Sequence, residues 1–393
     1  MNILQIHNRY RYIGGEDAGV DVEAVVLREA GHDVHQFVQD NPASNVAAAG
    51  ALLLAPWNPW AARLVGQVID DVKPDAAHVH NTWFALSPSI LRTLRKRGVP
   101  IVVTLHNYRL TCANALLLRN GQPCELCVGG NPWQAVRYAC YRDSRIASIP
   151  AAATIQLHRQ LGTWINDVDV FVVMTEVLRQ VMIRAGLPPE KLVIMPHYVS
   201  DPGRRKTAPS ESNVIVYAGR LSEEKGVHLL LDAWADAAPP GLELLIAGDG
   251  PERASLEQRL PRGARLAGHL NRTELARVML ESRALVMPSV WYETFGRVVI
   301  EAFAAGLPAA VSDGGAPAEI VTQNLGSQWV FPTRDRSALC HMLDTLADGD
   351  WCDYSGRVAR QAFEKKFSRQ HVAERLVQIY SSARTASPNV NRP

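Results

Sequence analysis

Short apolar runs alternate with longer amphipathic stretches along most of the chain. In the first half the apolar runs lie at residues 2–7, 33–38, 75–80, 100–105, 169–174 and 192–195, with helical patterns at 21–30 and 87–97. The second half repeats this rhythm with apolar runs at 213–218, 242–247, 284–287 and 308–312. Such an alternation predicts parallel sheets that are covered by helices on both faces.

A polar segment separates the two halves. Residues 200–212 (SDPGRRKTAPSES) are rich in Pro, Ser and charge, which is typical of a linker. A chain of 393 residues has the length of two domains. We expect two doubly wound α/β domains, with ligands at the carboxyl ends of the strands in a cleft between them. The expected boundaries are 1–200 for the first domain with a Cys-containing insertion at 108–147, 201–212 for the linker, 213–370 for the second domain, 371–385 for a C-terminal helix that packs back towards the first domain, and 386–393 for a disordered tail.

Composition removes several classes of protein. Hydrophobic residues make up 47% and charged residues 20%, and the net charge is +2, so binding of nucleic acid through bulk charge is excluded. The N-terminus (MNILQIHNRY) has no basic start followed by an apolar stretch, and it predicts a first strand. The longest apolar run, 46–56, is far short of the roughly 20 residues that a spanning helix needs. We therefore expect a cytoplasmic protein.

A first motif places two cations beside a helix start. In VYAGRLSEEKGVHLLLDAW, Arg220 and Lys225 follow a strand and precede a helix that begins near Gly226. Two cations on such a loop can bind a diphosphate from one side. A departing diphosphate gains negative charge, which donors at this place stabilise. The alternative is an exposed Arg and Lys beside Glu223 and Glu224.

A second motif, WYETFGRVVIEAFAAG, contains two carboxylates. Phe295 and Gly296 begin a helix that carries Glu301, and Glu293 lies on the preceding loop. A carboxylate accepts two hydrogen bonds from a vicinal diol, so Glu301 suits a ribose and Glu293 a hexose. Amides at the helix start can bind sugar hydroxyls or phosphate oxygens. The alternative is that glutamates are simply common in first helical turns.

Together these motifs resemble the retaining glycosyltransferases of family GT4, as do AGRLSEEKG, IAGDGPE and ETFGRVVIEA individually. The resemblance implies the GT-B fold, with an N-terminal acceptor domain and a C-terminal donor domain. It implies that Arg220 and Lys225 hold the donor diphosphate, that Glu301 binds the ribose, and that Glu293 lies at the transferred sugar. The remaining donor contacts that it implies are Gly250 and the amides of Thr294, Phe295 and Gly296.

The first domain supplies further residues to this resemblance. In HNRYRYIGG, the pair Gly14 and Gly15 lets the backbone approach a ligand closely, and in the family it closes over the donor phosphate. The following Glu16 and Asp17 are similar to a GGE variant of that loop. His106 ends the strand IVVTLH and matches the family's catalytic His, which implies contact with the transferred sugar or the reacting region. The alternative is a polar strand-end residue.

The first domain departs from the family pattern at two positions. The catalytic His of the family is usually followed by Asp, whereas Asn107 follows His106, so the usual His–Asp pair is in doubt. His197 stands in MPHYVS, where the family commonly has Asn, and no role is assigned to it. Retention by double displacement would need Glu293 as nucleophile. We favour front-face attack, in which the leaving diphosphate takes the proton of the acceptor.

Two other motifs are weaker. Gly248-Asp249-Gly250 is similar to a dinucleotide fingerprint, but Arg253 replaces its third glycine, which argues against a nicotinamide site. Asp167-Val168-Asp169 is similar to a metal-binding DxD, but it opens a strand. We interpret these two aspartates as solvated strand-end carboxylates, so no catalytic Mg²⁺ or Mn²⁺, and no other catalytic cofactor, is expected.

Four of the six cysteines fall close together after His106. They are Cys112, Cys124, Cys127 and Cys140, and the central pair has the Cys-x2-Cys spacing of a zinc knuckle. A structural zinc site is the favoured interpretation, and reduced or redox-active thiols and an iron–sulfur cluster are the alternatives. Cys340 and Cys352 are interpreted as ordinary buried residues.

The substrates follow only in outline. We expect a hexosyltransferase that uses a UDP- or GDP-linked sugar and a glycan or lipid-linked saccharide acceptor in surface or exopolysaccharide biosynthesis. A basic cluster at Arg92, Arg95, Lys96 and Arg97, with Trp57 and Trp60, predicts peripheral contact with the inner face of the cell membrane. A solvated helix face is the alternative. The competing functions are a non-catalytic sugar-nucleotide-binding protein of the same fold and a phosphorylase, for which no lysine-anchored pyridoxal site is evident.

Overall fold

The computed structural model describes residues 1–10, 15–237 and 239–387, and the chain folds into two compact units. Unit 1 contains residues 1–119, 124–198 and the chain from 369 onwards, and unit 2 contains 120–123 and 199–368. The segment expected as a linker, 201–212, packs onto unit 2. Arg360 binds Asp201 at 2.7 Å, and Ser210 N donates to Asp353 Oδ1 at 2.8 Å.

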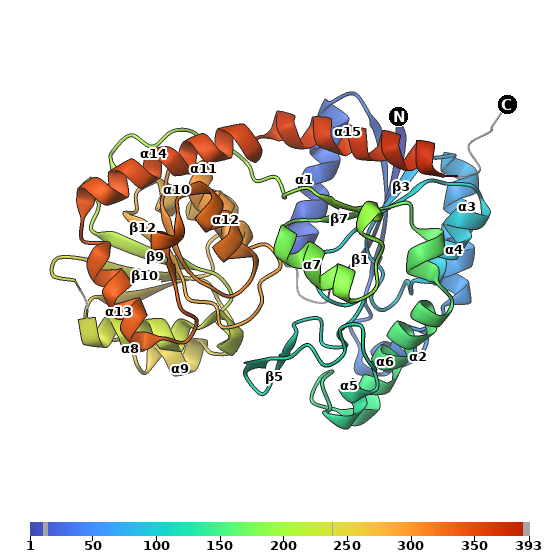
Figure 1. The fold of residues 1–393 in the computed structure, drawn as a ribbon, viewed down its shortest axis with the longest axis horizontal. Helices are drawn as coiled ribbons and strands as arrows, with labels where there is room; N and C mark the ends of the chain where they lie inside the picture. The colour runs from blue at the N-terminus through green and yellow to red at the C-terminus, as the bar shows by residue number, and fades with distance from the viewer. Residues whose placement is uncertain (11–14, 238, 388–393) are drawn as a thin grey trace. The chain divides into compact units, whose positions relative to one another are not determined.

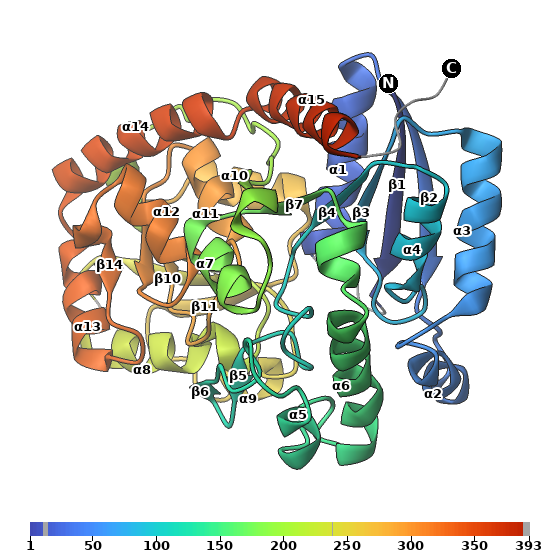
Figure 2. The ribbon, with the colours of Figure 1, turned by 45° about the vertical axis from the view of Figure 1, so that its right-hand side comes forward.

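Unit 1 is built on a six-stranded parallel sheet with the order β2-β1-β3-β4-β7-β8. Residues 3–8 of the first strand are buried, as expected for a strand covered on both faces. Figure 2 shows helices on the two sides of this sheet, α3 and α4 on one and α1 and α15 on the other. The strands are β1 (Asn2–Arg9), β2 (Asp33–Asp40), β3 (Ala76–Asn81), β4 (Ile101–Thr104), β7 (Val170–Val173) and β8 (Leu192–Ile194), and the helices are α1 (Gly15–Glu29), α2 (Asn45–Leu53), α3 (Pro59–Val72), α4 (Ser89–Lys96), α6 (Arg145–Gln160), α7 (Glu176–Arg184) and α15 (Arg369–Ala386).

The C-terminal helix α15 belongs to the core of unit 1 (Figure 1). Its apolar residues Val372, Leu376 and Ile379 pack with Ile3 and other residues of the sheet. The hydroxyl of Tyr380 lies 2.8 Å from a ring nitrogen of a buried histidine in β3. The helix therefore brings both apolar surface and a polar contact to the first sheet.

Between β4 and α6 the chain has little regular structure. This cysteine segment, residues 108–144, contains β5 (Leu118–Arg119), β6 (Gln122–Pro123) and the short helix α5 (Gln134–Arg137). It is nevertheless packed, since Tyr108, Ala113 and Ala135 are each at most 1% exposed. Figure 2 shows the segment as a mostly irregular trace around β5, β6 and α5.

Unit 2 has a six-stranded parallel sheet with the order β11-β10-β9-β12-β13-β14. In Figure 1, α8, α9 and α13 lie on one side of it and α10, α11 and α14 on the other. The sequence pattern missed the outer strands β11 and β14, which are half-exposed or only two residues long. The elements are β9 (Val214–Ala218), β10 (Glu243–Ala247), β11 (Ala264–Gly268), β12 (Ala284–Met287), β13 (Ala309–Ser312) and β14 (Val330–Phe331), with α8 (Val227–Ala237), α9 (Arg253–Glu257), α10 (Arg272–Leu280), α11 (Arg297–Ala304), α12 (Ala316–Asn324), α13 (Arg336–Thr345) and α14 (Gly349–Lys366).

Each sheet reverses its strand order once. The reversal lies between β1 and β3 in unit 1 and between β9 and β12 in unit 2. Open α/β sheets bind ligands at such points, outside the carboxyl ends of the strands. The predicted doubly wound α/β class is thus confirmed for both units. Among the described residues, no helix combines the length and apolar character needed to cross a bilayer.

Candidate active site

The two signature motifs of unit 2 meet at its strand-order reversal. The loop after β9 leads into a short helix, η4 (Glu223–Lys225), and the loop after β12 carries Glu293. Lys225 Nζ forms an ion pair with Glu293 Oε1, and Ser289 Oγ donates to the same oxygen at 3.2 Å. The Glu293 side chain is 7% exposed and that of Lys225 is 22% exposed. A buried carboxylate is therefore held by an ammonium group that still reaches solvent.

Gly226 allows the loop after β9 and the loop after β12 to lie close to one another. Gly226 has φ +71°, and a Cβ at this position would lie 2.0 Å from the carbonyl oxygen of Pro288. Beside this contact, Val290 N donates a 2.9 Å hydrogen bond to the carbonyl of Glu224. A side chain at residue 226 would push apart the loops that hold Lys225 and Glu293. The glycine after the lysine is thus explained by packing.

Gly250 has a packing role as well. A Cβ on this residue would lie 2.3 Å from the carbonyl oxygen of Leu221, and Leu221 N donates to the carbonyl of Asp249 at 2.9 Å. The 248–250 loop therefore packs directly against the loop that carries Arg220. The expected contact of Gly250 with a donor stays a prediction.

Arg220 is exposed at the end of β9. Its carbonyl accepts a 3.0 Å hydrogen bond from the hydroxyl of Tyr217. Burial raises the pKa of Tyr217, and the charges of Glu293 and Glu224 add to the shift. Because this phenol stays protonated, it remains a donor that fixes the backbone at Arg220, while the guanidinium faces solvent.

Glu301 lies in the second turn of α11 and pairs with Arg297, whose Nε is 2.9 Å from Oε1. Their side chains are 26% and 16% exposed, so one carboxylate edge is still accessible. Arg297 Nη1 and Trp291 Nε1 are buried donors without a hydrogen-bond partner in the part of the chain that the structure describes. Buried donors of this kind are costly unless a ligand or water satisfies them.

The start of α11 presents backbone amides in the same region. Its N-cap, Gly296, has φ +73°, and a Cβ there would lie 2.6 Å from Pro317 Cγ. A glycine cap has no side chain to accept from the first-turn amides. Such amides carry partial positive charge that favours anionic or polar ligand groups. Thr294 and Phe295, which lead into the helix, are 8% and 4% exposed.

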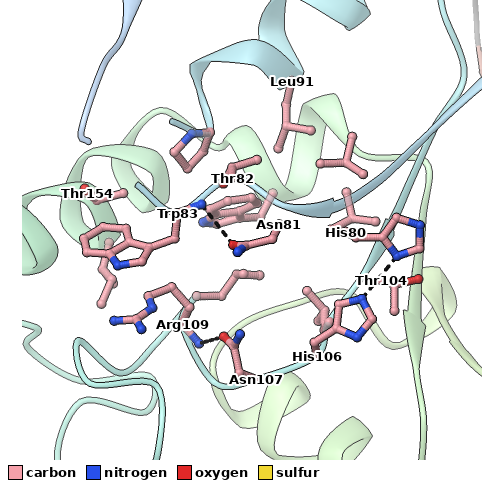
Figure 3. Close-up of a pocket in the computed structure, with 17 residues that line it drawn as sticks. His80, Asn81, Thr82, Trp83, Leu91, Thr104, His106, Asn107, Arg109 and Thr154 are labelled. Atoms are coloured by element: carbon pink, nitrogen blue, oxygen red, sulfur yellow. Dashed lines mark hydrogen bonds between the residues drawn. The ribbon is translucent and has the colours of Figure 1, made fainter. Parts of the chain in front are cut away.

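A pocket of about 600 Å³ lies in unit 1 beside the ends of β3 and β4 (Figure 3). Figure 3 shows His80 and His106 at one end of the pocket and Trp83 and Arg109 at the other. The Arg109 guanidinium lies 4.8 Å from the centre of the Trp83 ring. The pocket thus combines an aromatic wall with nitrogen donors and acceptors.

Histidines form a row from the interior of the sheet to this pocket. His80 Nδ1 lies 3.1 Å from His106 Nε2, and His106 Nδ1 lies 3.2 Å from His197 Nε2. Behind them, the carboxylate of Glu23 lies 3.4 Å from His80 Nε2 and 2.8 Å from His78 Nδ1. The row therefore starts at a buried carboxylate and passes through three imidazoles.

Burial makes neutral imidazoles the favoured state. It lowers the pKa of His80 to about 4, with His78 as the next cause and Glu23 opposing the shift. Burial, then the charges of His197 and His80, lowers the pKa of His106 well below its usual range. Burial raises the pKa of Glu23, but the charges and hydrogen bonds of His78 and His80 outweigh it and hold that pKa well below its usual value. The Glu23 carboxyl is thus held in its charged form, and burial favours the neutral form of the His80 and His106 rings.

The glycine-rich loop is described only in part. Gly14 lies outside the described residues, and Gly15 begins α1. Asp17, in the first turn of α1, lies 2.8 Å from His7 Nε2. Asn107, which replaces the usual Asp, donates to the hydroxyl of Tyr10 at 3.0 Å. The structure therefore places the Asn107 side chain beside Tyr10.

One interpretation made from sequence is wrong, and another is not supported. Asp167 and Asp169 are not solvated, because they are 7% and 6% exposed. Arg92 Nε lies 3.2 Å from Asp167, and Arg95 Nη2 lies 2.5 Å from Asp169. The basic cluster on α4 is likewise not a free face, since Arg97 binds Asp70 at 2.9 Å. Its arginines hold carboxylates, so they do not support contact with an anionic membrane.

The four clustered cysteines line one small cavity. They come from three stretches of the cysteine segment. Burial raises the pKa of Cys112 and of Cys127, the latter to about 12. Cys340 and Cys352 lie elsewhere, in helices α13 and α14, and Cys352 is fully buried.

Several residues of these sites were missed from sequence. His80 could have been found, because His78 and His80 alternate at the end of a strand and so lie on one face. Arg297 stands four residues before Glu301 on a helix, which is the spacing of a pair. Ser289, Trp291 and the stacked ring of His197 leave no such signal, since their contacts depend on how separate loops fold.

Two family models match the chain. The model described as Glycosyl transferases group 1 matches residues 202–364, and the one described as Glycosyltransferase Family 4 matches residues 14–201. Among curated proteins, glycogen synthase of Mycobacterium tuberculosis is 35% identical over 192 residues, which cover 46% of this chain and 44% of that protein. The 2-deoxystreptamine glucosyltransferase of Streptomyces kanamyceticus is 27% identical over 258 residues, 63% of this chain and 62% of that protein. The chain spans about half the length of the curated relatives that it matches.

Solved structures share the whole fold. HepE of Anabaena in complex with UDP and glucose has a TM-score of 0.64 at 17% identity, covering 97% of this chain and 99% of that chain. Sucrose-phosphate synthase of Thermosynechococcus elongatus has a TM-score of 0.72 at 18% identity, covering 98% and 99%. At such identities the likeness shows the fold alone, with a parallel six-stranded α/β sheet in each unit.

Proposed function

The chain belongs to family 4 of the glycosyltransferases, group 1, with the GT-B fold, and from this premise we propose that it transfers a hexose from a nucleoside-diphosphate sugar with retention of configuration. The observation that carries the proposal is the ion pair of Lys225 and Glu293 at the strand-order reversal of unit 2. It joins a cation suited to a diphosphate with a carboxylate suited to sugar hydroxyls.

In this proposal, Arg220 and Lys225 bind the diphosphate of a UDP- or GDP-linked donor. Arg220 is exposed and available, whereas Lys225 is shared with Glu293. As the leaving diphosphate gains charge, both cations stabilise it more than they stabilise the bound donor. Glu293 keeps Lys225 oriented and accepts from hydroxyls of the transferred sugar.

The ribose is assigned to Glu301. Arg297 occupies one oxygen of this carboxylate at 2.9 Å and leaves an accessible edge for the diol. The unpartnered donors Arg297 Nη1 and Trp291 Nε1 support a polar ligand beside this helix. The amides of Thr294, Phe295 and Gly296 complete the sugar and phosphate contacts, and Gly14, Gly15 and Gly250 are assigned to the donor by the family resemblance.

The reaction is written as a front-face displacement. The bond between the anomeric carbon and the diphosphate oxygen breaks, and a bond to the acceptor oxygen forms on the same face. The acceptor proton moves to the departing phosphate oxygen, so the diphosphate is leaving group and base. No metal ion or other cofactor takes part in this scheme.

The acceptor is assigned to the pocket of unit 1. His106, at one end of it, is given contact with the transferred sugar, and its low pKa makes it a neutral hydrogen-bonding group. The aromatic wall of Trp83 with Arg109 suits a saccharide ring. A glycan or lipid-linked saccharide, as used in surface or exopolysaccharide biosynthesis at the cytoplasmic face of the membrane, is the proposed acceptor.

Trp60, Val46 and Leu53 are 64%, 86% and 73% exposed, and these apolar residues replace the basic cluster as the proposed membrane contact.

A panel of UDP- and GDP-linked hexoses tests the proposal by thermal shift and by slow donor hydrolysis. One donor should raise the melting temperature and release its nucleoside diphosphate. Lys225→Ala should lose the hydrolysis, whereas Lys365→Ala, on an exposed turn of α14, should keep it. Binding without hydrolysis or transfer would favour the non-catalytic alternative, and cleavage by inorganic phosphate would favour a phosphorylase.

A further inference from the structure

The four clustered cysteines converge on one cavity from three stretches of the cysteine segment. Cys112 lies in the turn after Tyr108, Cys124 and Cys127 follow β6, and Cys140 follows α5. All four line a space of about 280 Å³. The four thiols therefore share one small space between these turns.

The other residues around this cavity define the ion's chemistry. They are Ala113, Asn114, Leu118, Arg119 and Ala135, so no carboxylate or imidazole of the described residues lines it. A set of ligands made only of thiolates selects soft or borderline cations, above all zinc or iron–sulfur clusters. Four thiolates match the closed tetrahedral set of a structural zinc ion.

The backbone of the segment also needs a stabilising partner. Ala115, Leu117, Asn120 and Ala139 have φ of +66°, +50°, +49° and +52°. L-residues avoid this left-handed region because of their Cβ, and only Asn among these four tolerates it well. Two strands of two residues each and a four-residue helix offer little regular structure to compensate. Metal binding is the usual source of stability for a fold of this kind.

Hydrogen bonds hold the turn that carries Cys112. The thiol of Cys112 donates to Asn114 Oδ1 at 2.9 Å, and Leu116 N donates to the same oxygen at 2.9 Å. Asn114 Nδ2 donates to the carbonyl of Leu118 at 2.7 Å. The turn with Cys112 is thereby tied to β5.

Among the described residues, Glu23, His78 and His80 have ligand atoms within 4.8 Å of one another, and the cysteines are not drawn together as closely. However, both ring nitrogens of His78 are engaged in hydrogen bonds. Nε2 contacts Thr104 Oγ1 at 2.7 Å, and Nδ1 contacts the hydroxyl of Tyr380 at 2.8 Å.

We propose that Cys112, Cys124, Cys127 and Cys140 bind one structural zinc ion that holds the turns of the cysteine segment together. The ion releases the thiol protons on binding and has no open coordination position, so it takes no part in the chemistry. Its effect reaches the pocket through Arg109, whose guanidinium donates to the carbonyl of Ala113, next to Cys112. Cys112 N in turn donates to the carbonyl of Tyr108 at 2.8 Å. The zinc thereby fixes a residue of the pocket wall.

Elemental analysis of the purified full chain tests this proposal without any activity assay. One zinc per chain is expected, and Cys124→Ser and Cys127→Ser should each lose it. Cys340→Ser, which changes a cysteine of α13 outside the cluster, is the matched control and should keep it.

The wild-type protein provides a second measurement if the serine variants do not fold. Titration with a mercurial should release zinc in step with the four clustered thiols, and growth with cobalt should yield the visible absorption of tetrahedral thiolate-bound Co²⁺. Stoichiometric iron with sulfide would overturn the proposal in favour of a cluster. Metal-free protein whose four thiols titrate freely, or whose mass shows disulfides, would overturn it as well.

Discussion

The ring of His106 is stacked on that of His197, with centroids 5.0 Å apart and planes 6° from parallel, and the facing nitrogens are 3.2 Å apart. The other nitrogen of His106, Nε2, lies 3.1 Å from His80 Nδ1. A neutral imidazole has one donor and one acceptor, so three neutral rings can pass hydrogen bonds along the row. A second proton on any of them would set donor against donor.

This arrangement predicts a loss of stability in mild acid. The pKa of His80 is about 4 in the folded chain and about 6.5 when unfolded, so the unfolded state binds protons first as the pH falls. Stability should be full above about pH 6.5 and should decrease towards pH 4, by on the order of 3 kcal/mol for this residue. Thermal unfolding across this range should show a smaller decrease for His80→Gln than for the wild type. The exposed His341→Gln is the control, and an equal decrease in both variants would contradict the assignment.

The diphosphate site predicts large effects on turnover. Arg220→Ala and Lys225→Ala should each reduce the rate of donor cleavage by about 10²-fold, the scale for losing one transition-state donor. Lys225→Ala also leaves the buried carboxylate of Glu293 unpaired, so its melting temperature should fall, and Glu293→Gln in the same chain should restore part of it. Near wild-type cleavage by both single variants would rule out this site.

The role of Glu301 can be separated from general damage with a modified donor. A hydrogen bond to a charged group contributes about 1.5–3 kcal/mol, so Glu301→Gln should weaken donor binding by roughly 10- to 100-fold. A donor with a deoxyribose should bind the wild type more weakly but bind the variant almost as the ribose donor does. Calorimetry measures both. The exposed Glu281→Gln should not change affinity, and equal losses for the deoxy donor in wild type and variant would place the ribose elsewhere.

Retention and metal independence form one further prediction. NMR of the product should show the anomeric configuration of the donor, because attack and departure share one face. Chelation by EDTA should leave the initial rate unchanged, since no metal acts on the diphosphate in the proposed scheme. An inverted product, or a rate restored only by Mg²⁺, would refute that scheme.

The buried arginine pairs of α4 predict a stability effect without a functional one. Arg95→Ala leaves Asp169, which is 6% exposed, without its cation and should cost about 3–5 kcal/mol of unfolding free energy. The neighbouring exposed Lys96→Ala should change it by less than about 0.5 kcal/mol. Chemical denaturation measures both values. Similar small effects would mean that the cluster is a solvated face after all.

The sequence alone determined the fold class and pointed to the residues that are proposed for the donor side. Buried parallel strands are often continuous apolar runs, so β4 and β9 were visible directly, and Arg220, Lys225, Glu293 and Glu301 stood in contiguous motifs. These features are local, because each depends on the period of one element or on the spacing within one loop.

Tertiary structure alone decided which side chains meet. Lys225 and Glu293 are 68 positions apart, and their contact depends on two strands becoming neighbours and on Gly226 admitting the carbonyl of Pro288. The stacking of His106 on His197 depends on separate strand ends meeting at the sheet edge, and the aspartates read as solvated are buried because α4 covers them. Such contacts follow from strand order and burial, which residue spacing along the chain does not contain.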